Sequence, residues 1–124
     1  MGQPVVHFEI IGDDPGRLRT FYAGLFGWDF AAGDAATEAV SAPGEYGFVS
    51  GEATGGINGG VGGGAGLEPR VLFYVGVPDV EAALVEAERL GGRRLLGPEG
   101  TPGVLVVGRF TDPQGNVVGV AGTR

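Results

Sequence analysis

The sequence predicts an α+β fold made of two copies of a strand–helix–three-strand unit. The chain begins with a strand of alternating apolar residues and continues into a helix with one apolar stripe. The same order of strand and helix returns near Val71, and a shift of 65 positions places Phe8 on Phe73 and Asp14 on Asp79. Eight short strands and two helices then suit an architecture in which helices cover one face of each sheet.

The first strand covers residues 5–11, and its alternate side chains point to opposite faces. One face is apolar, with Val6 and Phe8, and suits burial against a helix. The other face carries His7, the only histidine of the chain, together with Glu9. This spacing predicts that the imidazole and the carboxylate lie near one another.

The helix that follows has recognisable ends. Asp13 or Asp14 is expected to cap it, Pro15 suits its first turn, and Gly27 suits the left-handed residue that ends it. One apolar stripe is predicted from the spacing of five residues, Leu18, Phe21, Tyr22, Leu25 and Phe26.

The rest of the first half has weaker signals. Strands are predicted over residues 28–32 and 45–50, with a loop between them. Nine of the sixteen residues from 51 to 66 are glycine, and this segment predicts a short strand near 56–61 followed by a flexible linker. It lacks the GK[ST] ending of a phosphate-binding loop, so no nucleotide site is expected there.

The second half repeats the pattern. A strand starts at Val71, Asp79 is expected to cap a helix that ends at Gly91, and three strands follow over 93–96, 104–111 and 117–121. The last two strands are joined by the turn DPQGN, in which proline and glycine supply the required dihedral angles. We expect one domain, 1–124, with modules of approximately 1–64 and 65–124.

Composition excludes several classes of protein. The net charge is −7 and all eight basic residues are arginine, so the basic face of a nucleic-acid-binding protein is missing. No run of eighteen apolar residues is present, so no membrane span is expected. Cysteine is absent, which excludes disulfides and thiolate metal sites and is compatible with the cytoplasm, the predicted location.

Several stretches together resemble the vicinal oxygen chelate (VOC) superfamily, which includes glyoxalase I, bleomycin-resistance proteins and extradiol dioxygenases. These stretches include VVHFEI, FYAGLFGW, INGGVG and GRFTDPQGNVVGVAG. The resemblance covers nearly the whole chain. It implies paired βαβββ modules that form a cupped, incomplete barrel, a homodimer, and a small-molecule site in the cup.

Many enzymes of this superfamily bind a divalent metal through up to four positions. The resemblance places His7 at the first, Leu72 at its equivalent in the second half, Gly119 on the last strand, and a residue near Asn58 at the fourth. Leucine and glycine offer no donor side chain, and a catalytic ion usually needs about three protein ligands. We therefore expect no cofactor, unless Glu9 joins His7 from an unusual position.

The expected function is metal-independent binding of a small apolar or aromatic molecule in the cup. The predicted ligand-binding residues are His7, Glu9, Tyr46, Phe48, Asn58, Leu72 and Tyr74. One alternative is an enzyme (lyase, isomerase or dioxygenase) in which His7 and Glu9 act with or without a divalent metal. A second alternative is a dimeric interaction module with a degenerate site, in which these side chains serve only packing. Arg109 is placed by the sequence either in the cup or in solvent.

Overall fold

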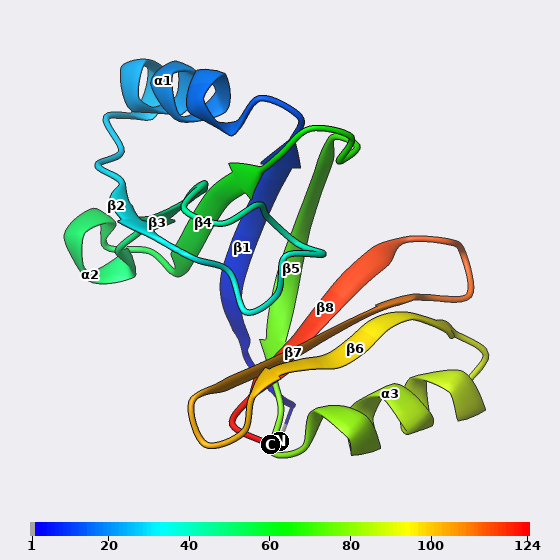
Figure 1. The fold of residues 1–124 in the computed structure, drawn as a ribbon. Coiled ribbons are helices and arrows are strands. Elements are labelled where there is room, and N and C mark those ends of the chain that lie inside the picture. The colour runs from blue at the N-terminus through cyan, green and yellow to red at the C-terminus, as the bar shows by residue number, and fades with distance from the viewer. Residues whose placement is uncertain (1) are drawn as a thin grey trace. The chain divides into compact units, whose positions relative to one another are not determined.

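We analysed a computed structural model that describes residues 2–124. The chain divides into two compact units, one of residues 7–71 and the other of the residues up to Val6 together with Leu72–Arg124. We call them the first and the second module. Each contains a strand, a helix and three further strands (Figure 1), with one short additional helix in the first module, so the predicted pair of βαβββ modules is confirmed. Their grouping into one domain, with a division near residues 64 and 65, stays a prediction.

The first module contains four strands and two helices. They are β1 (Val5–Gly12, with its first two residues in the other unit), α1 (Pro15–Phe26), β2 (Ala31–Gly33), β3 (Tyr46–Val49), α2 (Gly51–Thr54) and β4 (Asn58–Gly63). The strand order is β2-β3-β4-β1, in which β4 runs parallel to β1 and antiparallel to β3. The glycine-rich strand β4 therefore lies between the strands that carry His7 and Tyr46.

The second module repeats this topology. Its elements are β5 (Arg70–Gly76, of which Leu72 onward belongs here), α3 (Val80–Arg89), β6 (Arg93–Thr101), β7 (Leu105–Thr111) and β8 (Val117–Gly122). The order is β5-β8-β7-β6, with β8 parallel to β5 and antiparallel to β7. By position in this order, β5 corresponds to β1, β8 to β4 and β7 to β3.

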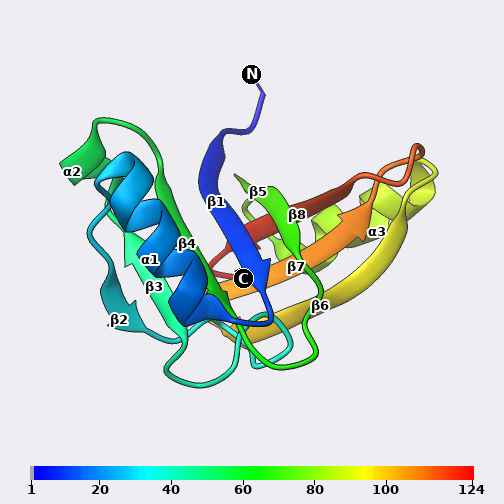
Figure 2. The same cartoon turned by 90° about the horizontal axis from the view of Figure 1, so that it is seen from above.

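Helix α1 has the predicted ends. The Asp14 carboxylate accepts a hydrogen bond from the backbone N–H of Arg17 at 3.1 Å, and Gly27 ends the helix with a φ of 69°. The helix lies against β4 (Figure 2). With 12 residues it is the longest helix of the described chain, well short of the roughly 20 residues that a membrane span needs.

The apolar stripe predicted for α1 is only partly buried. Phe21, Leu25 and Phe26 are each 57–59% exposed. Tyr22 of the same stripe is half-buried and packs on Trp28, whose ring lies 5.1 Å from that of Phe8 and 5.6 Å from that of Tyr22, centroid to centroid. The packing beside α1 therefore includes Trp28, a residue outside the predicted stripe.

Helix α3 is buried more deeply. Asp79 caps it through a 3.0 Å hydrogen bond from the backbone N–H of Ala82, as predicted. Val80 and Leu84 are fully buried in a core with Val106 and Val120 of the strands beneath. The buried face covers the first two turns, whereas Leu90 at the end of the helix is exposed.

The glycine-rich segment differs most from its prediction. Residues Gly51–Thr54 form the short helix α2, and β4 extends to Gly63, so the predicted flexible linker is wrong there. A Cβ atom on Gly59 would lie 1.9 Å from the Phe8 ring, and one on Gly60 would lie 2.0 Å from the Tyr46 ring. Glycine is needed in β4 because an aromatic ring lies over each face of the strand.

The remaining strands lie close to their predicted ranges, with two exceptions. The strand expected over residues 28–32 is only the three-residue β2, and the strand expected over 93–96 extends to Thr101 as β6. Pairing explains both lengths, because β2 contacts only the short β3, whereas β6 has the longer β7 as its partner.

Replacing Gly59 by alanine should lower the free energy of unfolding by at least about 1–3 kcal/mol, because the new methyl group overlaps the Phe8 ring. Gly24→Ala in α1 is the matched control. No atom lies within 4 Å of its added Cβ, and alanine in a helix should raise stability by up to about 1 kcal/mol. Urea unfolding measures both, and equal stability of Gly59→Ala and wild type would show that Phe8 does not lie over β4.

Candidate functional site

Three polar side chains of the first module form one hydrogen-bonded chain. Nε2 of His7 lies 2.9 Å from the hydroxyl oxygen of Tyr46, and this hydroxyl donates to Oε2 of Glu9 at 2.8 Å. The sequence predicted that His7 and Glu9 share a face of β1. The structure adds that the phenol of Tyr46 bridges them.

The bridge depends on the strand between its ends. Tyr46 belongs to β3 and the other two residues to β1, so the tyrosine side chain must cross β4. Gly60 pairs with Glu9 on one side and with Phe48 on the other, and a Cβ there would lie 2.3 Å from the Tyr46 hydroxyl oxygen. The missing side chain at Gly60 is the local reason why the phenol reaches Glu9.

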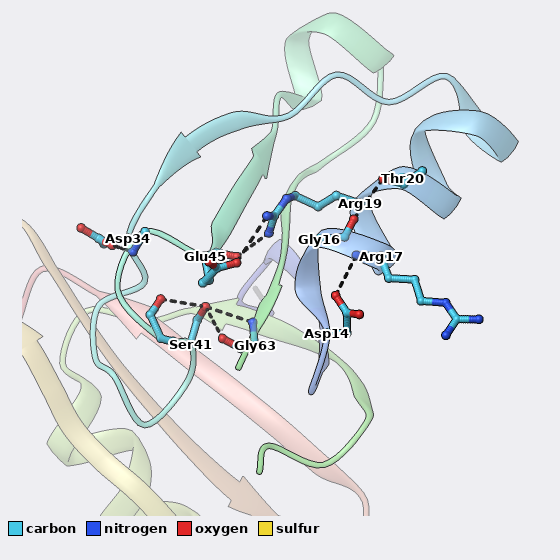
Figure 3. Close-up of polar contacts among 11 residues, drawn as sticks. Asp14, Gly16, Arg17, Arg19, Thr20, Asp34, Ser41, Glu45 and Gly63 are labelled. Atoms are coloured by element: carbon cyan, nitrogen blue, oxygen red, sulfur yellow. Dashed lines mark hydrogen bonds and ion pairs between the residues drawn. The ribbon is translucent and has the colours of Figure 1, made fainter. Parts of the chain in front are cut away.

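The segment that leads into Tyr46 is anchored at two points (Figure 3). The hydroxyl of Ser41 accepts from the backbone N–H of Gly63 at 3.0 Å and donates to its carbonyl at 3.1 Å. From helix α1, Arg19 donates to the backbone carbonyl of Glu45 and lies 3.5 Å from its carboxylate. The residue just before Tyr46 is thus tied to the helix, which fixes where β3 begins.

The three hydrogen-bonded side chains differ in how deeply they are buried. Glu9 is 3% exposed and Tyr46 is 2% exposed, whereas His7 is half-buried. Burial lowers the pKa of His7 below its ordinary value of 6.5, and the negative charge of Glu9 opposes this by raising it. The lowered pKa favours the neutral imidazole at pH 7, and a neutral imidazole both donates and accepts hydrogen bonds.

Two further predicted residues lie in the same module. The ring of Phe48 is half-buried, and its centroid lies 4.9 Å from that of Tyr46, so these two aromatic side chains are brought together. Asn58 pairs with His7 across β1 and β4 but is exposed. Its amide oxygen accepts a 2.8 Å hydrogen bond from the backbone N–H of Gly51, which gives this side chain a role in holding α2.

The second module carries its own buried polar pair. Leu72 and Tyr74 of β5 are both buried, and the Tyr74 hydroxyl oxygen accepts from Nε of Arg109 at 3.1 Å. Arg109 is 8% exposed, which excludes the solvent position that the sequence left open. The signal for its burial was its place among apolar residues of β7, but a single charged residue in a strand does not reveal its partner.

Strand register relates these positions to the internal repeat. Tyr74 pairs with Gly119 on β8, and a Cβ on that glycine would lie 2.3 Å from the tyrosine ring. Glu9 pairs with Gly60 in the same way. Gly60, rather than Asn58, is therefore the counterpart of Gly119 in the first module.

The side chains present do not fit the divalent metal that the resemblance to the VOC superfamily implies. Leu72, Gly119 and Gly60 provide no donor, and the Tyr46 hydroxyl occupies the place between Nε2 of His7 and the Glu9 carboxylate. Within residues 2–124, no three His, Cys, Asp or Glu side chains lie close enough to share an ion. We derive no chemistry through a metal.

Two hollows of the first module lie elsewhere. One, of about 460 Å³, is lined by Phe26, Gly27, Trp28, Ala53 and Thr54. The other, of about 390 Å³, lies at the end of β1 beside the start of α1 and is lined by residues that include Asp14, Arg17 and Phe21. Neither includes a residue of the His7–Tyr46–Glu9 chain.

Comparison with known proteins supports the architecture. A sequence model of the glyoxalase-like domain matches residues 8–121. No curated protein matches the sequence. The structure is similar to a glyoxalase/bleomycin resistance protein/dioxygenase superfamily member from Vibrio splendidus 12B01, with a TM-score of 0.50, 14% identity and coverage of 98% of both chains.

Two solved structures of epimerases are also similar. One is a methylmalonyl-CoA epimerase in complex with methylmalonyl-CoA and NH₄⁺, with a TM-score of 0.66 and 15% identity over 98% of this chain and 94% of that chain. The other is a variant of Streptomyces coelicolor methylmalonyl-CoA epimerase in complex with 2-nitronate-propionyl-CoA, with a TM-score of 0.64 and 14% identity over 98% and 97%. These likenesses show a shared fold.

Replacing Glu9 by glutamine should lower the pKa of His7 further, because the charge that opposes the effect of burial is removed. NMR titration of the imidazole measures this directly, since His7 is the only histidine. Glu45→Gln is the control, because that carboxylate pairs with Arg19 and should leave the His7 pKa unchanged. A His7 pKa that stays constant or rises in Glu9→Gln would contradict the coupling.

Proposed function

Since the chain belongs to the glyoxalase-like domain family of the VOC superfamily, we propose that it binds a small apolar or aromatic molecule without a metal ion. The binding surface in this proposal is the face of the first module that carries His7, Tyr46 and Phe48. The contributions of Asn58, Leu72 and Tyr74 to ligand binding stay predictions.

One observation carries the proposal: a half-buried imidazole is hydrogen-bonded to the buried Tyr46 hydroxyl, which is itself hydrogen-bonded to the buried Glu9 carboxylate. Small-molecule sites are typically apolar or aromatic surfaces with a few fixed polar groups that orient the ligand. Phe48 and the Tyr46 ring supply aromatic surface, and His7 supplies the fixed polar group. A neutral imidazole is suited to bind an uncharged hydrogen-bonding group of the ligand. A free carboxylate would bind more strongly to a positively charged side chain.

The similar epimerases were solved with coenzyme A esters, which shows that this fold holds small molecules in those proteins. At 14–15% identity their substrates do not transfer to this chain. Their chemistry does support a second candidate function, which is proton transfer.

The second candidate is a metal-independent isomerase or lyase in which His7 is the general base. The observation that favours it is the order imidazole, phenol, carboxylate, with the carboxylate at the buried end. A base whose positive charge, once formed, is stabilised by a nearby buried carboxylate is a recurrent arrangement in proton-transfer enzymes. Here Glu9 acts through Tyr46.

A thermal-shift screen of small aromatic and apolar compounds in EDTA tests the proposal, since a ligand that binds only the folded state must stabilise it. We expect stabilising compounds whose affinity EDTA does not change. His7→Ala should weaken their binding about tenfold, the effect of one lost hydrogen bond, whereas Val104→Ala at an exposed position should not. Binding that requires an added divalent ion, or that His7→Ala leaves unchanged, would overturn it.

The same compounds separate the two candidates. Each compound that binds is incubated with the protein in D₂O and then analysed by mass spectrometry. Deuterium that enters the compound with wild type but not with His7→Ala supports proton transfer. Unlabelled compound supports binding alone.

We also propose a cytoplasmic homodimer, supported by the exposed apolar side chains Phe21, Leu25 and Phe26 of α1. Sedimentation equilibrium should show a dimer. Leu25→Glu should weaken dimerisation by at least tenfold if α1 lies in the interface, because a charge would be buried there. Val104→Glu, at a position that is 73% exposed in the second module, should leave it unchanged, and a wild-type monomer would refute the dimer.

A further inference from the structure

We propose that Tyr46 is a positioning residue that fixes neutral His7 in the tautomer with hydrogen on Nε2, so that Nδ1 is the nitrogen that takes up a proton. The inference rests on the proposed role of His7 and adds which atom performs it. It restricts the ligand class: a molecule that bonds to the lone pair of this imidazole must present a hydrogen-bond donor or an acidic C–H group to Nδ1.

The assignment follows from counting hydrogens. The Tyr46 hydroxyl has one hydrogen, which it donates to Oε2 of Glu9 over 2.8 Å. Its oxygen can then only accept from Nε2 of His7, which lies 2.9 Å away. If Nε2 had a lone pair instead, two acceptor atoms would face each other at that distance, which is repulsive.

The buried carboxylate of Glu9 sets the direction in which the hydrogen bonds from His7 through Tyr46 run. A hydrogen bond from a hydroxyl to a carboxylate is stronger than one between neutral groups. Turning the hydroxyl hydrogen toward His7 would exchange this charge-assisted hydrogen bond at the buried Glu9 for a weaker one between neutral groups. Tyr46 cannot swing away as a whole, because its ring is buried over Gly60 and the preceding residue, Glu45, is tied to Arg19.

The tautomer also defines the proton-transfer step of the second candidate function. The C–H bond of the ligand breaks, the proton goes to Nδ1 of His7, and the electron pair stays on the ligand, delocalised into an adjacent carbonyl group. The imidazolium keeps its hydrogen on Nε2, and its charge is stabilised by Glu9 through Tyr46. In the reverse step, a proton returns from Nδ1 to carbon, and exchange of the Nδ1 proton with solvent between the two steps introduces deuterium when the solvent is D₂O.

Nitrogen-15 NMR of the ligand-free protein tests the assignment, at a pH above the titration of His7. The single histidine gives one pair of ring nitrogens, and two-bond nitrogen–proton correlations distinguish a protonated nitrogen from one with a lone pair. We expect Nε2 to be protonated and Nδ1 to have the lone pair. Hydrogen on Nδ1, or an equal mixture of the two forms, would overturn the proposal.

Tyr46→Phe tests whether the tyrosine is the cause. The Nε2 hydrogen should exchange with water about tenfold faster than in wild type, because one hydrogen bond is lost, and some Nδ1–H form should appear. Tyr22→Phe is the control, because Tyr22 packs on Phe26 and Trp28, and it should keep the wild-type exchange rate and tautomer. A Tyr46→Phe protein that is folded by circular dichroism and has unchanged exchange would overturn the role of Tyr46.

These outcomes are separate from those of the binding screen. The tautomer is read without any ligand, so a wild-type Nε2–H form stands even if no compound binds. Conversely, compounds that bind through His7 would support the proposed function even if the hydrogen proved to be on Nδ1. Each proposal can therefore fail alone.

Discussion

Tyr46 reaches Glu9 only because strand β4 presents no side chain at Gly60. This single constraint connects the unusual glycine content of residues 51–66 to the chemistry of His7. On the opposite face of the strand, Gly59 makes the same allowance for Phe8, whose ring continues into the Trp28 cluster beneath α1. Strand β4 thus allows close packing of aromatic rings beneath the helix on one face and the hydrogen-bonded residues His7, Tyr46 and Glu9 on the other. The cost of so many glycines in a strand is offset by the rings that lie over it.

The polar chain makes His7 useful without a metal. The resemblance to the VOC superfamily implies donor atoms around a cation, whereas leucine and glycine stand at three comparable positions here. A lone histidine at the surface would titrate near 6.5 and rotate freely. Burial lowers the pKa of His7, and Tyr46 fixes one of its ring nitrogens, so the imidazole is both neutral and oriented. In a metal site, coordination to the ion would fix the orientation of the imidazole; here the hydrogen bond to Tyr46 does so.

The sequence predicted the parts of the site that depend on local periodicity. Alternation placed His7 and Glu9 on one face of β1, and the shift of 65 positions revealed the repeat. The helix caps at Asp14 and Asp79 were also predicted correctly, because capping depends on a few neighbouring residues. The bridge through Tyr46 was not predicted, although the residue itself was a candidate. It depends on which strands pair and in what register, and those contacts join residues nearly forty positions apart.

Other misses have the same origin. The stripe on α1 was correct as a pattern, but Phe21 and Leu25 are exposed, and Tyr22 packs on Trp28, a residue outside the stripe. In the glycine-rich segment the short strand near 56–61 was predicted, but the linker after it was placed too early because propensity disfavours glycine in strands. The rings that overrule this propensity come from β1 and β3. Arg109 is a charged residue in an apolar strand, and only the fold shows that Tyr74 accepts its Nε hydrogen.

Strand β4 also limits how this scaffold can diversify. At Gly59 and Gly60 any larger residue would displace an aromatic ring. These two positions therefore tolerate no substitution, although neither glycine has a side chain that contributes to the site. New ligand preferences in descendants of this chain would have to arise at residues such as Phe48, where side-chain size is not dictated by a neighbour's ring crossing the backbone. A mutant library aimed at altered recognition would therefore keep the glycines and randomise around them.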